Sequence, residues 1–267
     1  MAGGESAFGC GGGGRVAIGI VLAGRRNTAG LAAAAPDVEW ESLVPIAGRP
    51  MLGHVVEALT ATPAVDRVIV AGPPAFVAAG VLVVPPGERV TASLRHALDA
   101  APSCRAPGEE LLIATGDAPL LTAAAVGALI DGARRRGLHL AYPIVRRELC
   151  EASFPGVHRT YVRLREGAFT GGNCFYLQGT AVDSALALLE RFYAERKRPL
   201  RLARLLGWGL LLGLVLGRAR LEDAEAAGSR LLGHPAGAVV AEDPGVGVDV
   251  DRPEDLEICR AFLARGR

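Results

Sequence analysis

The sequence predicts an α/β fold in which helices cover both faces of a doubly wound sheet. Half of the 267 residues are apolar and only 5% are aromatic, a composition that suits a core of Ala, Val and Leu between helices and strands. Three short, continuous apolar runs each end in Gly or Asp, which is typical of parallel strands buried on both faces. We expect these strands at residues 15–24, 65–72 and 110–117.

Helical patterns separate and follow the three strands. Residues 49–61 carry a proline near their start and apolar residues on one helical face. Residues 91–101 and 121–137 repeat this pattern, with Thr122 as the expected N-cap of the last helix. The alternation of strands and helices indicates a Rossmann-like doubly wound sheet, which binds ligands in the crevice at the carboxyl ends of its strands.

The pattern changes in the second half of the chain. Residues 159–178 alternate in a strand-like way with glycines at the turns, which predicts antiparallel strands and therefore a mixed sheet. A helical subregion is expected at about 181–233, followed by a short strand at 245–251 and a helix at 253–266. No repeat or linker interrupts the sequence, so we predict that residues 15–267 form a single domain.

Two segments bear on targeting and membrane contact. Residues 1–14 are too rich in glycine to pack and lack the charged start and apolar centre of a signal peptide, so we expect a disordered leader. Residues 205–217 are apolar but fall short of the roughly 20 residues that a membrane-spanning helix needs. A buried helix is the favoured interpretation, and a helix at a membrane interface is the alternative.

The charge balance and the cysteines restrict the classes of partner. The formal net charge is +1 and both signs are interspersed, so nothing favours a nucleic acid or an anionic membrane, and we expect a small-molecule substrate. The five cysteines form no C-x-x-C pair, and the five histidines lack metal-ligand spacing. These patterns predict buried thiols in a cytoplasmic protein rather than disulfides or a zinc site.

The first candidate site is the turn after the first strand, where Leu22, Ala23 and Gly24 lead into Arg25 and Arg26. A glycine there lets successive N–H groups point at an anion, and the arginines can form charge-assisted bonds to phosphate oxygens. The spacing matches neither the dinucleotide fingerprint nor the Walker motif. From these residues alone, a phosphate-binding loop and a plain turn are equally good interpretations.

Asp117 is the second candidate, because it follows the strand at 110–117 in a Gly-Asp-Ala-Pro turn. A carboxylate at the carboxyl end of a strand can bridge Mg²⁺ to the phosphates of a substrate. The alternative is an N-cap for the next helix, but Thr122 already offers a competing cap. We therefore predict that Asp117 is a Mg²⁺ ligand.

Asp249 and Asp251 alternate along the expected strand at 245–251, so their side chains should point the same way. Two carboxylates on one side of a strand repel each other unless a cation or a basic group lies between them. Asp251, followed by Arg, Pro and Glu, also resembles a helix start. We assign Asp249 to the metal and Asp251 to the N-cap.

Gly171, Gly172 and Asn173 form the fourth candidate. Glycines permit close approach of a ligand to the backbone, and an asparagine can bond a hydroxyl or a ribose. We therefore place Gly172 and Asn173 in the substrate site, with a β-bulge or a tight turn as an equally weighted alternative.

Seven segments follow one another along the chain: VLAG at 21–24, LVPIAGRPMLGHVVEAL at 43–59, VDRVIVAG at 65–72, SLRHAL at 93–98, TGDAPLL at 115–121, GGN at 171–173 and DVDRPEDL at 249–256. In this order, they resemble the MobA-like NTP transferases of the nucleotidyltransferase superfamily, which has a glycosyltransferase-A-like fold. The Pro-Ile-Ala-Gly-Arg-Pro-Met-Leu and Gly-Asp-Ala-Pro-Leu-Leu blocks are fairly specific for this family.

The resemblance implies transfer of a nucleotidyl group from an NTP to a phosphorylated small-molecule acceptor, with release of pyrophosphate. In such enzymes the Leu-Ala-Gly loop holds the triphosphate, which corresponds here to 22–24, and a segment like the one beginning at Ser93 lies near the base. The resemblance also implies Mg²⁺ contacts for Asp117 and Asp249. Such a displacement needs few protein groups beyond a metal clamp and positive charge on the phosphates.

The chain departs from the family pattern at three positions. Arg25 replaces the second glycine of the usual loop, Ala29 stands where the family has an arginine, and Glu41 stands where it has a lysine. Arg25, Arg26 and Arg49 are the candidates to supply the missing charge, and Arg25 and Arg26 are assigned a catalytic role. The alternatives are a noncatalytic nucleotide- or nucleotide-sugar-binding protein and, more weakly supported, a glycosyltransferase.

Overall fold

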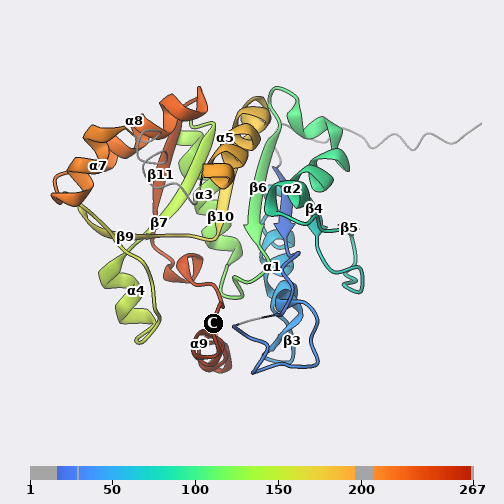
Figure 1. The fold of residues 1–267 in the computed structure, drawn as a ribbon. Helices are drawn as coiled ribbons and strands as arrows, with labels where there is room; N and C mark the ends of the chain where they lie inside the picture. The colour runs from blue at the N-terminus through green and yellow to red at the C-terminus, as the bar shows by residue number, and fades with distance from the viewer. Residues whose placement is uncertain (1–16, 29, 196–206, 266–267) are drawn as a thin grey trace, which may run out of the picture.

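The computed structural model describes residues 17–28, 30–195 and 207–265, which form a mixed α/β fold (Figure 1). Within these residues, nine strands form one sheet in the order β5-β4-β1-β6-β10-β7-β9-β8, with β11 paired to β7. The strands of this sheet are β1 (Ala17–Leu22), β4 (Val65–Ala71), β5 (Val81–Val84), β6 (Glu110–Thr115), β7 (Leu140–Arg146), β8 (Val162–Leu164), β9 (Gly167–Gly171), β10 (Cys174–Gln178) and β11 (Ala236–Ala241).

Helices surround this sheet, and a two-stranded ribbon of β2 (Pro45–Ile46) and β3 (Arg49–Pro50) lies apart from it. The helices are α1 (Met51–Thr60), α2 (Val90–Asp99), α3 (Ala123–Arg136), α4 (Arg147–Ser153), α5 (Val182–Glu195), α7 (Trp208–Val215), α8 (Leu221–Leu232) and α9 (Pro253–Ala264).

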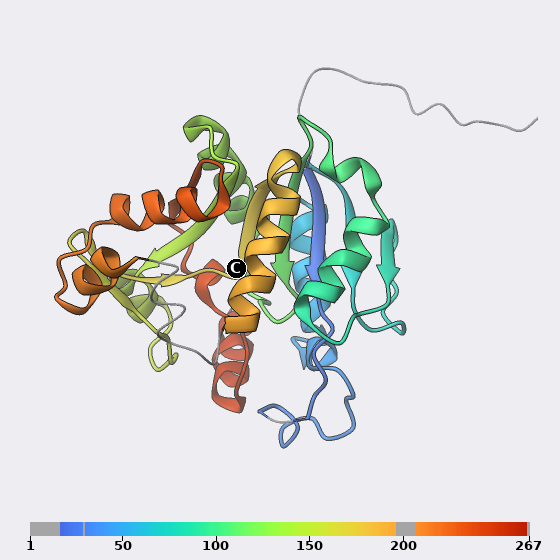
Figure 2. The same ribbon diagram turned by 45° about the horizontal axis from the view of Figure 1, so that its top comes forward.

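β1 lies between β4 and β6 and is parallel to both. Because successive side chains of a strand point to opposite faces, β1 supplies both cores of the sheet. Ala17 and Val21 pack with α1 and α3, whereas Ile18 and Ile20 pack with α2 and α5. Figure 2 shows α2 and α5 together on one face of the sheet.

A buried ionic cluster lies at the amino end of β6. Glu110 is only 1% exposed, and Arg134 of α3 donates to it from Nε (3.0 Å) and from Nη2 (2.6 Å). The Tyr176 hydroxyl of β10 also donates to the Glu110 carboxylate, at 2.9 Å. Burial and this hydrogen bond raise the pKa of Tyr176 to about 12. The cluster therefore ties α3 to two strands of the sheet.

Several sequence predictions are confirmed. The runs at 15–24, 65–72 and 110–117 contain β1, β4 and β6, and the antiparallel pairing of β10 with β6 makes the sheet mixed. Thr122 is the N-cap of α3, since its hydroxyl accepts the N–H of Ala125 at 3.1 Å. The cysteines within the described residues are buried free thiols, and Cys10 lies outside these residues.

The prediction of a strand at 245–251 is wrong. Pro244–Gly247 form a 3-10 turn that Asp243 caps by accepting the N–H of Gly245 at 2.8 Å, and the residues that follow are irregular. The place beside β7 is already taken by β11, which the sequence analysis assigned to no element. The segment thus has no free strand to pair with at this position.

The expectation of a buried helix at 205–217 is also wrong. Helix α7 occupies part of this range, and none of its residues is buried. Leu210 and Leu214 pack on a small apolar cluster, but the opposite side of the helix has no covering element within the described residues. No helix in the described part of the chain is long and apolar enough to cross a membrane.

The predicted leader at 1–14 and Ala29 lie outside the described residues. The division of the chain into a leader and a single domain stays a prediction. The helical subregion predicted at about 181–233 contains α5, α7 and α8 within the parts that are described.

Candidate functional site

The carboxyl ends of β1, β4 and β6 meet in a layer of small residues. Ala23 donates its N–H to Ala71 at 2.9 Å, and Gly116 donates its N–H to Leu22 at 2.9 Å. A Cβ on Gly116 would lie 2.7 Å from the Cβ of Ala23, and one on Gly72 would lie 2.9 Å from it. These glycines let the three strand ends approach closely, so the turns that follow β1 and β6 are neighbours.

Gly24 lies against the segment that leads into α2. A Cβ on Gly24 would lie 2.5 Å from the Cβ of Pro86 and 3.4 Å from the hydroxyl of Ser93. That hydroxyl also accepts the N–H of Gly87 at 3.0 Å. The structure therefore brings the predicted phosphate turn and the predicted base-side serine together.

Asp117 follows β6 at the same edge. Its Oδ1 is buried and has no hydrogen-bond partner, while its backbone carbonyl accepts the N–H of Val250 at 2.9 Å. Burial raises the pKa of Asp117 to about 6; the Thr115 hydroxyl opposes this change, and the carboxylates of Asp249 and Asp251 add to it. A buried carboxylate with an unpartnered oxygen is suited to a cation.

Arg25 joins two of the nearby acidic residues. Its Nε lies 2.9 Å from Oε2 of Glu41, and its Nη1 donates to Oδ1 of Asp251 at 2.6 Å. The Glu41 side chain is only 3% exposed; burial raises its pKa, and the charge of Arg25 opposes this. The two departures from the family pattern at 25 and 41 are thus one ion pair, so the reversed charge at 41 has a partner of opposite sign.

Replacement of Arg25 by alanine should lower the free energy of unfolding by about 1–2 kcal/mol, because it leaves the buried Glu41 carboxylate without its cation. The Arg25→Ala/Glu41→Gln double variant should recover part of this loss. Urea unfolding of the natural chain, Arg25→Ala, Glu41→Gln and the double variant measures the coupling energy between the two side chains. Arg26→Ala is the matched control. If Arg25→Ala and Arg26→Ala lowered the free energy of unfolding equally, the prediction would be contradicted.

Arg26 lies apart from this cluster. Its guanidinium stacks over the ring of Trp40, 3.9 Å from the centroid, and pairs with the exposed Glu39. Arg49, a third candidate for the missing charge, is bound by Glu57 and His54. Of the three arginines, only Arg25 contacts the acidic residues near Asp117, so it is the better placed of the two that we assigned a catalytic role.

Asp249 has a basic partner that the sequence analysis missed. Arg159 donates to the Asp249 carboxylate and to the carbonyl of Gly247, and both ionic side chains are largely buried, at 14% and 21% exposed. The sequence predicted that Asp249 and Asp251 need a cation or a basic group between them. At Asp249 the structure has a basic group, Arg159. No sequence signal marks Arg159, which is 90 positions away. The assignment of Asp249 to a metal stays a prediction.

Asp251 does not cap the last helix, which corrects the sequence assignment. The N-cap of α9 is Arg252, whose N–H donates to the Asp255 carboxylate at 3.1 Å. The Asp251 carboxylate instead binds Arg25. The segment before α9 is irregular rather than a strand, and it places the Asp251 carboxylate beside the turn that follows β1.

The glycines before β10 make room for the protein itself. A Cβ on Gly171 would overlap the Tyr142 hydroxyl, and one on Gly172 would lie 2.8 Å from Cγ of Pro143. Asn173 accepts the N–H of Thr115 on its carbonyl (3.0 Å) and donates its own N–H to Val246 (2.9 Å). These contacts favour the tight-turn alternative, and a substrate role for Gly172 and Asn173 stays a prediction.

The predicted residues enclose a small hollow of about 20 Å³ at the edge of the sheet, enough for one water molecule. In the described part of the chain, no group of three or more His, Cys, Asp or Glu side chains is arranged to hold a metal ion. Mg²⁺ at Asp117 would thus depend on phosphate oxygens for further ligands, as it commonly does. The hollow is lined by Leu22, Ala23, Arg25, Glu41, Ser42, Gly116 and Asp117.

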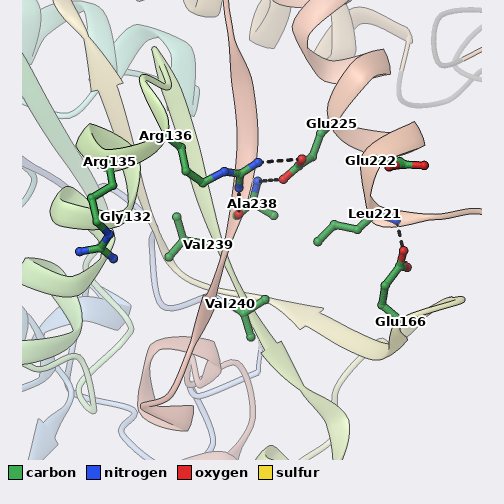
Figure 3. A pocket seen from close by; sticks show the side chains of 10 residues that line it. All are labelled: Gly132, Arg135, Arg136, Glu166, Leu221, Glu222, Glu225, Ala238, Val239 and Val240. Carbon is green, nitrogen blue, oxygen red and sulfur yellow. Dashed lines mark hydrogen bonds and ion pairs between the residues drawn. The ribbon is translucent and has the colours of Figure 1, made fainter.

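A larger hollow of about 460 Å³ lies away from these residues, between α3, α8 and β11 (Figure 3). Two of its charged side chains bind each other and the backbone: Glu225 accepts the N–H of Ala238 and a bond from Arg136, both at 2.8 Å. Arg136 also donates to the carbonyl of Ala238 at 2.5 Å. These side chains satisfy the open edge of β11, which favours a structural role for this hollow.

Comparisons with known proteins place the chain. A family model described as the MobA-like NTP transferase domain matches residues 29–228. A structure described as a hypothetical transferase from Thermus thermophilus is 44% identical, with a TM-score of 0.80 over 90% of this chain and 99% of that one. A search of curated proteins yields no match.

Two more distant structures have the same fold. The 2-C-methyl-D-erythritol 4-phosphate cytidylyltransferase of Thermus thermophilus is 19% identical, with a TM-score of 0.52 over 92% of this chain and 98% of that one. A CMP:2-keto-3-deoxy-manno-octonic acid synthetase complexed with CTP is 18% identical, with a TM-score of 0.57 over 95% of this chain and 100% of that one. The chain thus has the fold of the nucleotidyltransferases and belongs to the MobA-like NTP transferase family.

Proposed function

We propose that the protein transfers a nucleoside monophosphate from an NTP to a phosphorylated small-molecule acceptor and releases pyrophosphate, with Mg²⁺ bound at Asp117. The observation that carries this proposal is the buried, unpartnered Oδ1 of Asp117 at the carboxyl end of β6, next to the glycine turn after β1. Membership of the family supports the nucleotidyl transfer, and the donor set fits the cation because Mg²⁺ prefers carboxylate and phosphate oxygens.

In this reaction an oxygen of the acceptor's phosphate attacks the α-phosphorus of the NTP. The bond between the α-phosphorus and the bridging oxygen breaks, and pyrophosphate leaves. Backbone N–H groups of the turn at 22–24 would hold the triphosphate, and Asp117 would hold Mg²⁺, which neutralises charge on the phosphates when bound. Asp249 is proposed as a second metal contact that would have to share its carboxylate with Arg159.

Arg25 is proposed to orient the phosphates while it stays paired with Glu41 and Asp251. Burial opposes the protonated form of Arg25, but its hydrogen bond to Asp251 and the charge of Glu41 raise its pKa, so the guanidinium is charged throughout the pH range of an assay. The acidic neighbours also hold it in one place, which lowers the entropy lost when a phosphate binds.

Pyrophosphate release tests the proposal. The protein is incubated with Mg²⁺ and each of the four NTPs, with sugar phosphates, alditol phosphates and pterin phosphates as acceptors. Pyrophosphate that depends on both the acceptor and Mg²⁺ is the expected result. NTP binding without release for any acceptor would contradict the proposal and support a noncatalytic nucleotide-binding protein.

One observation favours that second candidate: the acidic residues around Arg25 already neutralise it. The Arg25→Gly/Glu41→Lys variant restores the usual family residues at both positions. If it releases pyrophosphate when the natural chain does not, the site has lost catalysis through this ion pair. The cytoplasmic location stays a prediction.

A further inference from the structure

Helix α7 carries two apolar stripes on different sides. Leu210 and Leu214 form the inner stripe, and they pack on a cluster that includes Ile144, Leu164 and Phe169. This packing anchors the helix to β7, β8 and β9. Figures 1 and 2 place α7 at the outer end of the molecule, on the side opposite β5.

The outer stripe is exposed. Trp208, Leu212 and Val215, together with Leu216 just after the helix, are 59%, 61%, 83% and 53% exposed. Their spacing of four, three and one residues puts them on one face of the helix. Large apolar side chains gathered at this exposure indicate a surface that contacts something other than water.

Arginines lie near both ends of α7. The exposed Arg218 follows it in the chain. At one end of the helix, Cδ of Arg163 lies 3.6 Å from where a Cβ on Gly217 would be, and at the other end Nη2 of Arg230 lies 3.6 Å from where a Cβ on Gly207 would be. Positive charge therefore flanks both ends of α7.

The chain between α7 and α8 adds to this charge. Residues 207–220 contain Arg218 and Arg220 and no acidic residue. Arg220 pairs with Glu166 and Glu222, at 3.9 and 2.6 Å. Arg163, Arg218 and Arg230 therefore supply the positive charge near α7.

We propose that α7 docks the protein on an anionic lipid bilayer, with the outer stripe in the headgroup region and the surrounding arginines on lipid phosphates. An exposed tryptophan, an apolar stripe and flanking arginines are the features of a helix that lies in a membrane interface. A second copy of the chain is the less suitable partner, because it would bring the two sets of arginines together. The net charge alone conceals this local concentration of arginine.

Vesicle binding tests the proposal without any nucleotide, so the result does not depend on the enzymatic activity. The chain has two tryptophans; Trp40 is 8% exposed, so a change in fluorescence on membrane contact should come from Trp208. We expect a blue shift and co-sedimentation with vesicles of phosphatidylglycerol and phosphatidylcholine. Raising the ionic strength from about 0.1 M to about 1 M shortens the Debye length from about 10 Å to about 3 Å and should weaken binding.

The Leu212→Glu/Val215→Glu variant should bind these vesicles at least tenfold more weakly, and because both side chains are exposed its fold should persist, as circular dichroism would verify. Val77→Glu is the matched control, since Val77 is 88% exposed and lies outside α7; its binding should not change. Trp208→Phe should sediment with the vesicles but lose the blue shift. Equal binding to pure phosphatidylcholine vesicles would overturn the proposal. So would a second outcome, in which the natural chain does not bind vesicles but forms a dimer, and the Leu212→Glu/Val215→Glu variant is a monomer.

Discussion

Replacement of Asp117 by alanine is expected to abolish Mg²⁺-dependent NTP binding and to lower the rate of pyrophosphate release by about 10³-fold or more. The variant loses the carboxylate whose Oδ1 faces the site without a partner, and with it the cation that balances charge on the phosphates. Titration calorimetry with each NTP, with and without Mg²⁺, measures the dissociation constant of the NTP. Unchanged binding would show that the site lies elsewhere.

Asp131→Ala is the matched control for this experiment, because Asp131 is an exposed aspartate on α3 and its replacement should not change NTP binding.

The pH dependence of NTP binding by the natural chain provides a further test. A carboxyl with a pKa of about 6 must lose its proton before it can bind Mg²⁺. We therefore expect metal-dependent NTP binding to weaken as the pH falls through 6, with a loss of one proton on binding.

The same pKa predicts an effect on stability in the absence of metal. The folded-state value of about 6 lies above the ordinary value of 3.8, so the ionised carboxylate destabilises the fold above pH 6, and this cost disappears below about pH 4. Asp117→Asn should raise the free energy of unfolding at pH 8 by about 1–3 kcal/mol and leave it unchanged near pH 4. Denaturant titrations at the two pH values measure the difference.

Replacement of Arg134 by alanine is expected to lower the free energy of unfolding by about 3–5 kcal/mol. It strands the carboxylate of Glu110, which is 1% exposed, and removes the tie between α3 and β6. Since the cluster is at the opposite end of β6 from Asp117, binding of an NTP to the folded protein should be affected little. Urea unfolding measures the loss.

Arg135 provides the control for this prediction, since it is the next residue of the same type and is exposed. Arg135→Ala should change the free energy of unfolding by no more than about 0.5 kcal/mol. The Glu110→Gln change in the Arg134→Ala background should restore part of the loss, because it removes the stranded charge. A loss in Arg134→Ala below about 1 kcal/mol would show that the cluster contributes little.

The parts of the fold that the sequence predicted are those that local patterns determine. The buried runs of β1, β4 and β6 have a continuous apolar character, and Thr122 caps α3 through residues three positions away. The errors arose where tertiary contacts determine whether a segment forms a strand or whether a helix is buried. β11 competes for the place beside β7, and the exposure of α7 depends on which elements reach it.

The candidate site shows the same division. The positions of Asp117 and the turn at 22–24 at one edge of the sheet could be predicted, because strand ends are identifiable in a sequence. The pairing of Arg25 with Asp251 joins positions 226 residues apart, and no local pattern reveals such a partner. A basic residue can take any of several carboxylates, so the choice among them is made by the fold.

The pairing of Arg25 with Asp251 also has a consequence for synthesis on the ribosome. Because Asp251 lies 226 residues after Arg25, the turn after β1 leaves the exit tunnel well before the segment that completes its surroundings. Until Asp251 has emerged, Arg25 lacks one of its two carboxylate partners. A chain truncated before Asp251 should therefore fail to form the complete site, even if the strands around the turn have already folded.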